Sequence, residues 1–418
     1  MNKIQLSEEL KWRGFINQTT FEDMEDLNKQ SWVFYHGFDA SAPSQTIGNL
    51  AAMMFDKVFM RHGHKAILLA GGSTSLIGDP GGKDAERPLQ SEETIANNIA
   101  QAEKQLKKVF DGQQFTLVNN LDWTKGLKVL DFLRDIGKHF SMTPLVQRDY
   151  IAKRLGEGGA GMSYAEFSYT LLQGLDYLYL YDNYGVTLQL GGADQWGNCL
   201  SGVELIRKAR SKEVHAITLP LIINGATGKK FGKSEDGSIW LDESLTSVYQ
   251  FYQFWLNVDD KGVENYLKVY TELDKDEIDA VMVDFNNDRA SRVAQKTLAY
   301  EVTKIVHGED QAIKHQHMIE VLFGNRSYNE LSETELTEFW EETGKHIVKL
   351  ATELAEVLVQ TNLAASKTEA RRFIEDNAIY INGLQIPLSK TTLDNDDAIN
   401  GYVVLRRGKN SQVVIKIS

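Results

Sequence analysis

The sequence predicts an α/β protein whose first half is a parallel sheet with crossover helices, followed by a helical segment and a small α+β module. Three observations support this prediction. Short apolar runs that end in glycine alternate with helical patterns through the first half. From about residue 241 to 345 the apolar spacing is mostly helical. Near the C-terminus, two segments alternate apolar and polar residues as strands do.

The elements of the first half follow from apolar spacing and glycine. Strands are predicted at 32–37, 66–72 and 187–192, where apolar runs end in glycine. Between the first two, apolar residues recur at helical spacing from Ile47 to Val58, and Gly63 supplies a C-terminal stop. Strand, crossover helix and strand together are the unit from which parallel sheets are built.

The second half has a different character. The aromatic-rich stretch 249–255 lies in the helical segment. Beyond it we expect a short helix over 367–374 and strands near 379–383, 402–407 and 413–417. At roughly 150 residues per domain, 418 residues predict two or three domains. We place them at 1–240, 241–345 and 346–418.

The composition is that of a globular protein from a reducing compartment. Apolar residues make up 42% and charged residues 25%, and no run approaches the roughly 20 apolar residues of a membrane span. The first residues lack the apolar core of a secretory signal, so we expect a cytoplasmic protein with no membrane partner. The single cysteine, Cys199, excludes internal disulfides and a cysteine-clustered metal site, and we expect no protein-held metal.

Charge is distributed unevenly along the chain. The formal net charge of −13 argues against indiscriminate nucleic-acid binding, and we expect no DNA partner. Residues 366–418 contain eight Lys/Arg and six Asp/Glu, whereas the remainder contains 37 and 52. If RNA is a partner, the C-terminal module contributes to binding it.

The segment Lys230 to Ser234 reads Lys-Phe-Gly-Lys-Ser and lies between Gly228 and Gly237. Its two lysines, Lys230 and Lys233, stand three apart on a stretch that glycine leaves free to move, as an enzyme gripping a leaving pyrophosphate requires. Taken alone, such a loop is more often solvated surface. Its interpretation therefore depends on the other segments.

Polar residues follow the first predicted strand, at the edge where open α/β sheets bind ligands. Gly37, Asp39 and Ser41 come directly after it, and Thr46 to Asn49 opens the next helix. The free N–H groups of a helix N-terminus favour phosphate, and Gly48 lets a nucleotide approach the backbone. The alternative for Thr46 is a plain helix cap.

Two more segments carry groups suited to a nucleotide. The glycine-rich loop at 78–83 contains Lys83, and Arg87 follows, so the loop could fold over a triphosphate; it lacks P-loop spacing, and a solvated loop is the alternative. Asp194 and Gln195 follow the strand that ends at Gly192, where an acid and an amide could hold a ribose diol. A structured turn is the alternative there.

A helix that begins after Ser163 presents a polar face. Ser163 and Glu166 fit a capping box, and Tyr169, Gln173 and Asp176 fall at i, i+4 and i+7 of the helix that it opens. Leucines occupy mostly the other side, so the polar face meets either water or a pocket. Water is the usual answer, but a phenol and an amide beside one carboxylate suit a small ligand with an amine and a hydroxyl.

Together these segments resemble the bacterial-type tyrosyl-tRNA synthetases, which are class I aminoacyl-tRNA synthetases. The resemblance rests on Glu166 to Tyr169, Gln173, Asp176, Gly191 to Asn198 and Lys230 to Ser234 in that order, and it extends from Leu10 through 131–140 to Lys409. It implies a Rossmann-type catalytic domain, a helical domain and an S4-like RNA-binding domain. It also implies two reactions, in which tyrosine and ATP give tyrosyl-adenylate and the tyrosyl group then passes to the 3′ end of tRNA-Tyr.

The resemblance assigns roles to individual residues. Tyrosine would be held at its hydroxyl by Tyr35 and Asp176, and at its ammonium by Asp79, Tyr169 and Gln173. ATP would contact Gly37, Asp39, Ser41, Gly48, Gly192, Asp194, Gln195 and Lys233. Activation, with Mg²⁺ accompanying ATP, would use Lys83, Arg87, Lys230, Lys233 and Ser234 together with Thr46 and Asn49.

One segment departs from the family's pattern. Members normally carry His-Ile-Gly-His at the helix opening, where this chain has Thr46-Ile47-Gly48-Asn49. A carboxylate that attacks a phosphate needs no general base, so neither histidine is required as a proton carrier. Thr46 and Asn49 still donate hydrogen bonds but supply no cation, so we expect slower activation. His36 follows Tyr35 where the family often has cysteine; it either reaches the ribose or packs as a neutral side chain.

The C-terminal module carries the candidates for tRNA contact. They are Lys367, Arg371, Arg372, Arg406, Arg407 and Lys409, with Tyr380 as a stacking surface; scattered surface charge is the alternative. The stretch 129–146 resembles the subunit interface of the family, so we expect a homodimer. Two alternative functions remain: a catalytically impaired homologue that binds RNA, and the tryptophanyl enzyme of the same class.

Overall fold

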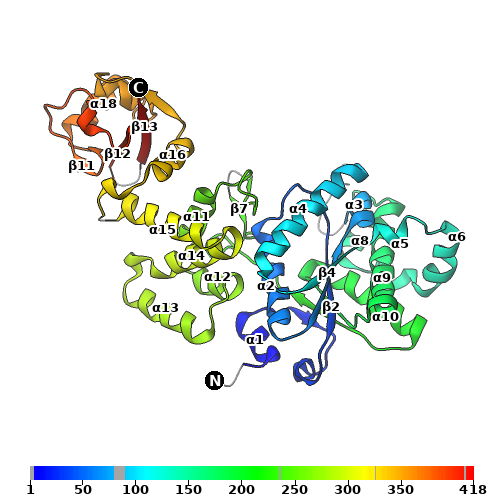
Figure 1. Ribbon diagram of the computed structural model, residues 1–418. Coiled ribbons are helices and arrows are strands. Elements are labelled where there is room, and N and C mark those ends of the chain that lie inside the picture. The colour runs from blue at the N-terminus through cyan, green and yellow to red at the C-terminus, as the bar shows by residue number, and fades with distance from the viewer. Residues whose placement is uncertain (1–3, 80–89, 235–236, 325, 409–410) are drawn as a thin grey trace. The chain divides into compact units, whose positions relative to one another are not determined.

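The computed structural model describes residues 4–79, 90–234, 237–324, 326–408 and 411–418 (Figure 1). These residues form two compact units. The first runs to Ser247 and includes Phe254–His307, and the second comprises Val248–Gln253 and Gly308–Ser418. The helices between 241 and 345 are thus shared between the units, and the division into three domains remains a prediction.

A six-stranded sheet forms the centre of the first unit, in the order β1-β6-β5-β2-β3-β4. The strands are β1 (Gln18–Thr19), β2 (Val33–Phe38), β3 (Lys65–Ala70), β4 (Phe115–Asn119), β5 (Leu188–Gly192) and β6 (His215–Leu219). All neighbouring pairs are parallel except β1 with β6. The predicted parallel sheet is confirmed, and it is the core of a Rossmann-type domain.

Crossover helices connect these strands. They are α2 (Ile47–Arg61), α3 (Gly72–Ile77), α4 (Glu92–Phe110), α9 (Tyr164–Tyr184) and α10 (Trp196–Arg210). From β2 the chain builds outward through β3 to β4 and then returns to build β5 and β6 on the other side of β2. The strand order therefore reverses between β2 and β5, which is where open α/β sheets bind their ligands.

The core of the first unit covers both faces of the sheet. Successive side chains of a strand point to opposite faces. On one face, the Tyr35 ring lies 5.1 Å from that of Tyr177 on α9. On the other, the Phe34 ring lies 5.4 Å from that of Phe59 on α2. This alternation decides which residues of β2 face α9 and which face α2.

The remaining helices of the first unit are mostly short. They are α1 (Leu6–Arg13), α5 (Leu121–Thr124), α6 (Val129–Asp131), α7 (Met142–Val146), α8 (Asp149–Leu155), α12 (Val263–Tyr270), α13 (Lys275–Asn287) and α14 (Val293–His307), together with short 3₁₀ helices such as η1 (Met24–Lys29). Arg13 fixes α1 to α12, because its buried guanidinium donates to Glu9 at 2.7 Å and to the carbonyl of Lys268 at 2.7 Å. The hairpin strands β7 (Lys233–Ser234) and β8 (Gly237–Ser238) pair with each other.

The second unit is a five-stranded sheet covered by helices, in the order β11-β10-β12-β13-β9. Its strands are β9 (His346–Val348), β10 (Ile379–Ile381), β11 (Leu384–Gln385), β12 (Tyr402–Arg407) and β13 (Ser411–Ile417). Its helices are α15 (Glu309–Phe323), α16 (Glu333–Glu342), α17 (Leu354–Gln360) and α18 (Lys367–Glu375), and α11 (Val248–Leu256) begins in this unit. The predicted C-terminal helix and strands are confirmed.

Both faces of this second sheet are buried. Val403 and Leu405 of β12 pack into a cluster that contains Leu354 and Leu358 of α17. Tyr402 and Val404 point the other way, into a cluster with residues of α15 and α16. The C-terminal module therefore shares its core with helices that precede residue 345. None of the described helices is long and apolar enough to cross a membrane.

Candidate active site

A cavity of about 720 Å³ opens at the carboxyl ends of the parallel strands, where the strand order reverses. Most residues predicted for the small-molecule site line it: Tyr35, Gly37, Asp39, Ser41, Thr46, Gly48, Asn49, Asp79, Gln173, Asp176, Gly192, Asp194, Gln195 and Lys230. Tyr169 joins this set through a hydrogen bond to Asp39. Lys83 and Arg87 lie outside the described residues, as do the side chains of Lys233 and Ser234.

Asp176 forms the buried end of the cavity. Its side chain comes from α9, where Ser163 and Glu166 form the predicted capping box. One carboxylate oxygen accepts a hydrogen bond from Asn120 Nδ2 at 3.0 Å, and the other accepts one from Trp123 Nε1 at 2.9 Å. Burial raises the pKa of Asp176 to about 7, while these two hydrogen bonds oppose the rise. The carboxyl group is thus rigidly held and still has acceptor capacity for a ligand hydroxyl.

Two polar atoms beside Asp176 have no hydrogen-bond partner among the described residues. They are the hydroxyl oxygen of Tyr35 and Oε1 of Gln173, and both are buried. Burying an unpaired polar group costs about 1–3 kcal/mol, so such atoms in a cavity are typical of a site that a ligand completes. A donor and an acceptor beside a carboxylate match a ligand that carries both a phenol and an ammonium group.

The next part of the cavity is a network of carboxylates. The hydroxyl of Tyr169 donates to Oδ2 of Asp39 at 3.2 Å, and Thr74 donates to its Oδ1 at 3.0 Å. Across the opening, Gln195 Nε2 donates to Asp79 at 2.6 Å and to Asp194 at 3.3 Å. Carboxylates held in this way attract an ammonium group and accept hydrogen bonds from ribose hydroxyls.

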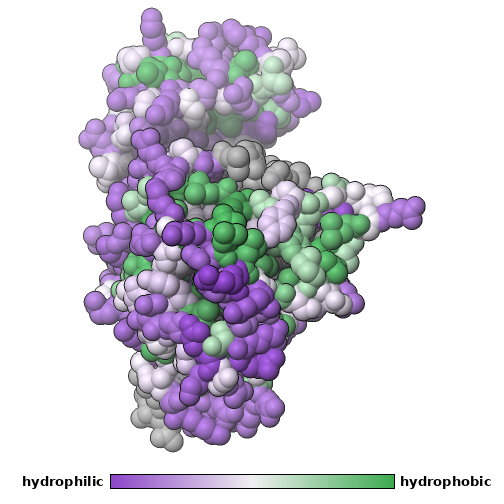
Figure 2. All heavy atoms as spheres, turned by 90° about the vertical axis from the view of Figure 1, so that its right-hand side faces the viewer, coloured by the Kyte–Doolittle hydropathy of each residue, from purple (hydrophilic) through white to green (hydrophobic). Residues whose placement is uncertain are grey.

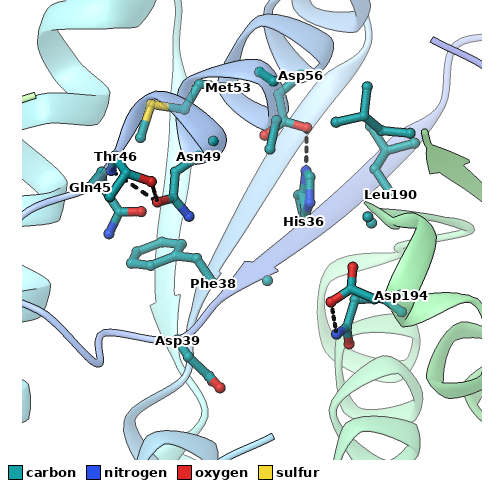
Figure 3. A pocket seen from close by; sticks show the side chains of 18 of the residues that line it. His36, Phe38, Asp39, Gln45, Thr46, Asn49, Met53, Asp56, Leu190 and Asp194 are labelled. Atoms are coloured by element: carbon teal, nitrogen blue, oxygen red, sulfur yellow. Dashed lines mark hydrogen bonds and ion pairs between the residues drawn. The ribbon is translucent and has the colours of Figure 1, made fainter. Parts of the chain in front are cut away.

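The N-terminus of α2 meets the cavity at Thr46 and Asn49 (Figure 3). Asn49 Oδ1 accepts hydrogen bonds from the backbone N–H of Thr46 at 3.0 Å and from its hydroxyl at 2.8 Å. The oxygen of the Asn49 amide therefore serves the helix cap, and its Nδ2 remains as a donor for a ligand. The capping interpretation of Thr46 is thus confirmed by these contacts, while its predicted role in ATP binding stays a prediction.

The Lys-Phe-Gly-Lys-Ser segment approaches the same helix. Gly232 has a φ of +94°, and a Cβ built on it would lie 2.8 Å from Cγ1 of Ile47. Only glycine fits so close an approach with that backbone conformation. Phe231 anchors the segment, because it is buried against Phe254, Trp255, Tyr266 and Tyr270. Lys230 is exposed and lines the cavity.

A buried histidine and carboxylate pair also lines the cavity (Figure 3). His36 of β2 and Asp56 of α2 are 9% and 3% exposed, and Nδ1 of the histidine lies 2.7 Å from Oδ1 of the aspartate. Burial raises the pKa of Asp56, and the neighbouring His36 opposes the rise. His36 is therefore a buried side chain whose Nδ1 is paired with the carboxylate of Asp56.

Two protein families match the chain. The family described as tRNA synthetases class I (W and Y) matches residues 27–324, and the tyrosine-tRNA ligase SYY-like C-terminal domain matches 339–415. The tyrosine-tRNA ligase of Bacillus caldotenax is 41% identical over 99% of this chain and 100% of its own length. The chain belongs to the tyrosine-tRNA ligase family. The tyrosine-tRNA ligase of Streptococcus pyogenes is also 41% identical, again over 99% and 100% of the two chains.

Solved structures of tyrosyl-tRNA synthetases share the fold. A C-terminally truncated mitochondrial enzyme from Aspergillus nidulans superposes with a TM-score of 0.69 at 32% identity, covering 77% of this chain and 95% of its own. The Archaeoglobus fulgidus enzyme, solved with L-tyrosine, has a TM-score of 0.54 at 14% identity over 75% of this chain and 100% of its own. The second likeness shows the fold alone.

The side chains predicted to bind tRNA fall into two groups: exposed cations on α18, and arginines of β12 that contact a ring or a backbone carbonyl. Exposed Lys367 and Arg371 form surface ion pairs, with Glu356 at 2.9 Å and Glu353 at 3.0 Å. The Arg406 guanidinium lies 4.0 Å from the Tyr380 ring centroid, and Arg407 donates to the Leu363 carbonyl at 2.7 Å. Arg372 is exposed, and Lys409 lies outside the described residues. The exposed three are therefore the better candidates for phosphate contacts.

Sequence reasoning missed the residues that hold the tyrosine-tRNA ligase site in shape. Asn120 and Trp123 orient Asp176, Thr74 orients Asp39, and Asp56 pairs with His36. Asn120 directly follows β4, so the rule that placed Asp39 and Asp194 after strands applies to it as well. Asp56 has a weaker signal: it is the one acid in α2, a mostly apolar helix, and it is buried there.

Proposed function

We propose that this chain is a tyrosine-tRNA ligase that activates tyrosine with ATP and transfers the tyrosyl group to the 3′ end of tRNA-Tyr in the cytoplasm. The observation that carries the proposal is the cavity's inner end. There, the Asp176 carboxyl group lies with the Tyr35 hydroxyl, which has no hydrogen-bond partner among the described residues, next to the residues proposed to bind the ammonium, Asp79, Tyr169 and Gln173. A tyrosine side chain satisfies these groups with its phenol.

In the first reaction, the carboxylate of tyrosine attacks the α-phosphorus of ATP and pyrophosphate leaves. Asp79, Tyr169 and Gln173 bind the ammonium, while Asp39, Asp194 and Gln195 hold the ribose. Asn49 Nδ2 and Lys230 face the phosphates, with Lys233 and Ser234 completing the set from β7. Such sites accelerate phosphoryl transfer by positioning and by stabilising phosphate charge, and no protein nucleophile is needed.

Magnesium would enter with ATP. Mg²⁺ prefers oxygen ligands and usually keeps several waters, so the phosphates of ATP would hold it here, because Asp39 and Asp194 are proposed to hold the ribose. When bound, the ion neutralises charge on the phosphates of ATP. Lys83 and Arg87, which the sequence places in the loop after Asp79, are proposed to add to this neutralisation.

In the second reaction, a terminal ribose hydroxyl of tRNA attacks the acyl carbon of tyrosyl-adenylate and AMP leaves. Lys367, Arg371 and Arg372 of the second unit are proposed to contact the tRNA backbone, and Arg406 on Tyr380 offers a stacking surface. Phenylalanine has no hydroxyl, so it would leave the buried Tyr35 hydroxyl unsatisfied and the remaining acceptor capacity of Asp176 unused. Tyrosyl-tRNA synthetases are the standard example of discrimination by this means.

The protein is proposed to act as a homodimer. Large apolar side chains are exposed between residues 129 and 142, among them Val129 at 71%, Leu130 at 78% and Met142 at 59%. Figure 2 looks onto the side of the first unit that carries α6 and shows hydrophobic side chains gathered there. A patch of this kind on a soluble domain marks an interface, and a second copy of the chain is the proposed partner. Leu130→Glu should convert the dimer into a monomer in sedimentation equilibrium.

Charging of tRNA-Tyr with labelled tyrosine tests the proposal. The purified protein should form tyrosyl-tRNA in an ATP-dependent reaction and release AMP. The alternative, an impaired homologue that binds RNA, predicts a gel shift of tRNA-Tyr without either product. Failure of both the charging assay and tyrosine-dependent pyrophosphate exchange would exclude the proposed activity.

A further inference from the structure

We propose that Gln45, the residue that precedes Thr46 at the start of α2, binds the outer phosphates of ATP through its side-chain amide. The inference rests on the proposed function, because it assigns one more contact to the pyrophosphate that leaves during activation. Gln45 lines the cavity, and Figure 3 shows its side chain beside those of Thr46 and Asn49. The amide of Asn49 is already a proposed phosphate contact, so a second amide stands next to it.

The side-chain amide of Gln45 has capacity for a ligand although the residue is almost completely buried. Gln45 is 5% exposed. Its backbone N–H and carbonyl both form hydrogen bonds, whereas neither end of its amide has a hydrogen-bond partner among the described residues. Buried amides are ordinarily hydrogen-bonded within the protein, so an unpartnered one that meets a cavity is typical of a group that a ligand completes.

A closed set of hydrogen bonds involving α4 fixes the backbone of Gln45. Its N–H donates to Oε1 of Gln105 at 2.9 Å, and Nε2 of the same Gln105 amide donates to the Ser44 hydroxyl at 2.8 Å. That hydroxyl in turn donates to the Gln45 carbonyl at 2.9 Å. Both ends of the Gln105 amide are thus used inside the protein, and the side chain of Gln45 starts from a fixed backbone. A donor held in this way loses little conformational freedom when it binds.

The carbonyl of Gln45 also connects it to the segment that follows the Lys-Phe-Gly-Lys-Ser loop. The N–H of Leu241 donates to this carbonyl at 2.9 Å, and the N–H of Ile47 donates to the carbonyl of Ile239 at 3.1 Å. Gln45 and Lys230 both line the cavity. The amide and the loop therefore border the end of the cavity at which α2 begins.

The position of Gln45 favours phosphate over ribose as its ligand. Figure 3 shows Gln45 and Asp194 on opposite sides of the pocket, and Asp194 is proposed to hold the ribose. The triphosphate then extends from the ribose towards the N-terminus of α2, a 15-residue helix whose free N–H groups favour anions. Thr46 and Asn49 supply no cation there, so a donor from Gln45 Nε2 adds to the stabilisation of the leaving pyrophosphate.

Pyrophosphate itself is the probe that tests the assignment. Enzyme-bound tyrosyl-adenylate is mixed with pyrophosphate, and the formation of ATP is followed at increasing pyrophosphate concentration. Gln45→Leu keeps the approximate size of the side chain but removes the amide, so it should raise KM for pyrophosphate by about tenfold. KM for tyrosine in the exchange reaction should stay within about twofold. Gln45→Glu, whose carboxylate repels phosphate, should raise KM for pyrophosphate at least about tenfold further.

Melting temperatures separate the effect on binding from an effect on folding. Because Gln45→Leu removes an unpartnered buried amide, its melting temperature should equal or exceed that of the wild type. Gln45→Met, whose side chain is unbranched and adaptable, repeats the test if leucine does not fit.

Two variants on α4 test the positioning role of Gln105. Gln105→Leu should lower the melting temperature and raise KM for pyrophosphate by a smaller factor than Gln45→Leu, since Gln105 acts through Gln45 as a positioning residue. In the double variant Q45L/Q105L this second effect on KM should disappear. The matched control is Gln101→Leu, about one turn earlier on the same helix, where the amide oxygen accepts from Lys104 at 3.3 Å. It should leave both KM values unchanged.

Three results would overturn the inference. They are an unchanged KM for pyrophosphate in folded Gln45→Leu, equal increases for pyrophosphate and tyrosine, or a higher KM for ATP with that for pyrophosphate unchanged. The last result would place the amide at the adenine or the ribose. These outcomes presuppose that the wild-type protein forms tyrosyl-adenylate. Absence of pyrophosphate exchange in the wild type would instead count against the proposed function itself.

Discussion

The ring of Phe231 stacks on the ring of Tyr266, with centroids 4.2 Å apart and planes inclined by 22°. Tyr266 also holds the other arm of the same loop, because its hydroxyl accepts the backbone N–H of Gly225 at 3.1 Å and donates to Asp259 at 3.2 Å. The backbone of Phe231 donates to the carbonyl of Ile222 at 2.9 Å, which closes the loop at its base. One tyrosine of α12 thus fixes both arms of the segment that carries Lys230 and Lys233.

Removing the Tyr266 hydroxyl should slow activation without weakening tyrosine binding. Tyr266→Phe keeps the stack on Phe231 but loses the hydrogen bonds to Gly225 and Asp259, so the lysines are held less well. We expect a roughly tenfold lower rate of adenylate formation in a stopped-flow or quench assay, since each lost bond is worth about 1 kcal/mol. Tyr270→Phe is the control, because it deletes a buried hydroxyl that has no partner among the described residues. Equal effects of the two variants would refute the role of Tyr266.

Asn49→Asp should separate the stability of α2 from its catalytic use. The variant keeps Oδ1, which caps the helix by accepting from Thr46, and adds a negative charge that favours a helix N-terminus. It replaces the Nδ2 donor with a charge that repels phosphate. The melting temperature should therefore stay the same or rise, while the rate of adenylate formation falls by about a hundredfold. Asn49→Ala, which loses both functions, should be less stable; a fast Asn49→Asp enzyme would show that phosphate does not meet this side chain.

Asp176 should make stability depend on pH. Its folded pKa of about 7 lies above the ordinary value near 3.9, so the folded protein binds the proton more tightly than the unfolded chain. The resulting stability is complete below about pH 4 and is lost as the pH rises through about 7. Relative to Asp176→Asn, the wild-type free energy of unfolding should decrease across this range in urea titrations. A difference that does not change with pH would contradict the raised pKa.

Asp176→Ala should also affect one substrate selectively. The tyrosine concentration needed for half-maximal pyrophosphate exchange should rise far more than the ATP concentration, because the carboxyl group meets the phenol end of the cavity. Asn120→Ala is a milder companion variant that leaves the carboxyl in place but removes a hydrogen bond of 3.0 Å. Equal effects of Asp176→Ala on both substrates would refute the assignment.

Lys367→Glu with Arg371→Glu should separate activation from charging. The two cations are exposed on α18, and reversing their charge should repel the tRNA backbone and raise KM for tRNA by at least about tenfold. Pyrophosphate exchange should not change, because it needs no tRNA. Point substitutions are preferable to deleting residues 350–418, since Tyr402 and Val404 of β12 complete the core of α15 and α16. Normal charging by the double variant would place the tRNA elsewhere.

Local signals in the sequence were sufficient for much of the fold and site. The apolar run that ends at Gly37 correctly predicted β2. The capping box of Ser163 and Glu166 correctly predicted where α9 begins. That start in turn places Tyr169, Gln173 and Asp176 on one face of the helix. These features depend on neighbours within a few residues. Sequence periodicity therefore specifies them directly.

Long-range relationships could not be predicted in the same way. Asn120 and Trp123 reach Asp176 across more than 50 residues, and His36 meets Asp56 across 20. Such pairs depend on which elements the sheet order brings together. The boundary of the second unit likewise depends on long-range packing, because α15 and α16 form one core with the final strands. The composition of the sequence does not indicate that these helices belong with the C-terminal strands.

The most direct test of the central claim is ATP-pyrophosphate exchange by the wild-type protein with tyrosine, phenylalanine and tryptophan compared side by side. The cavity that ends in Tyr35 and Asp176 predicts rapid exchange with tyrosine and at least about a thousandfold lower kcat/KM with either other amino acid. It also predicts that Lys233→Ala nearly abolishes the tyrosine-dependent signal. Preference for tryptophan, or no exchange with any of the three, would contradict the account.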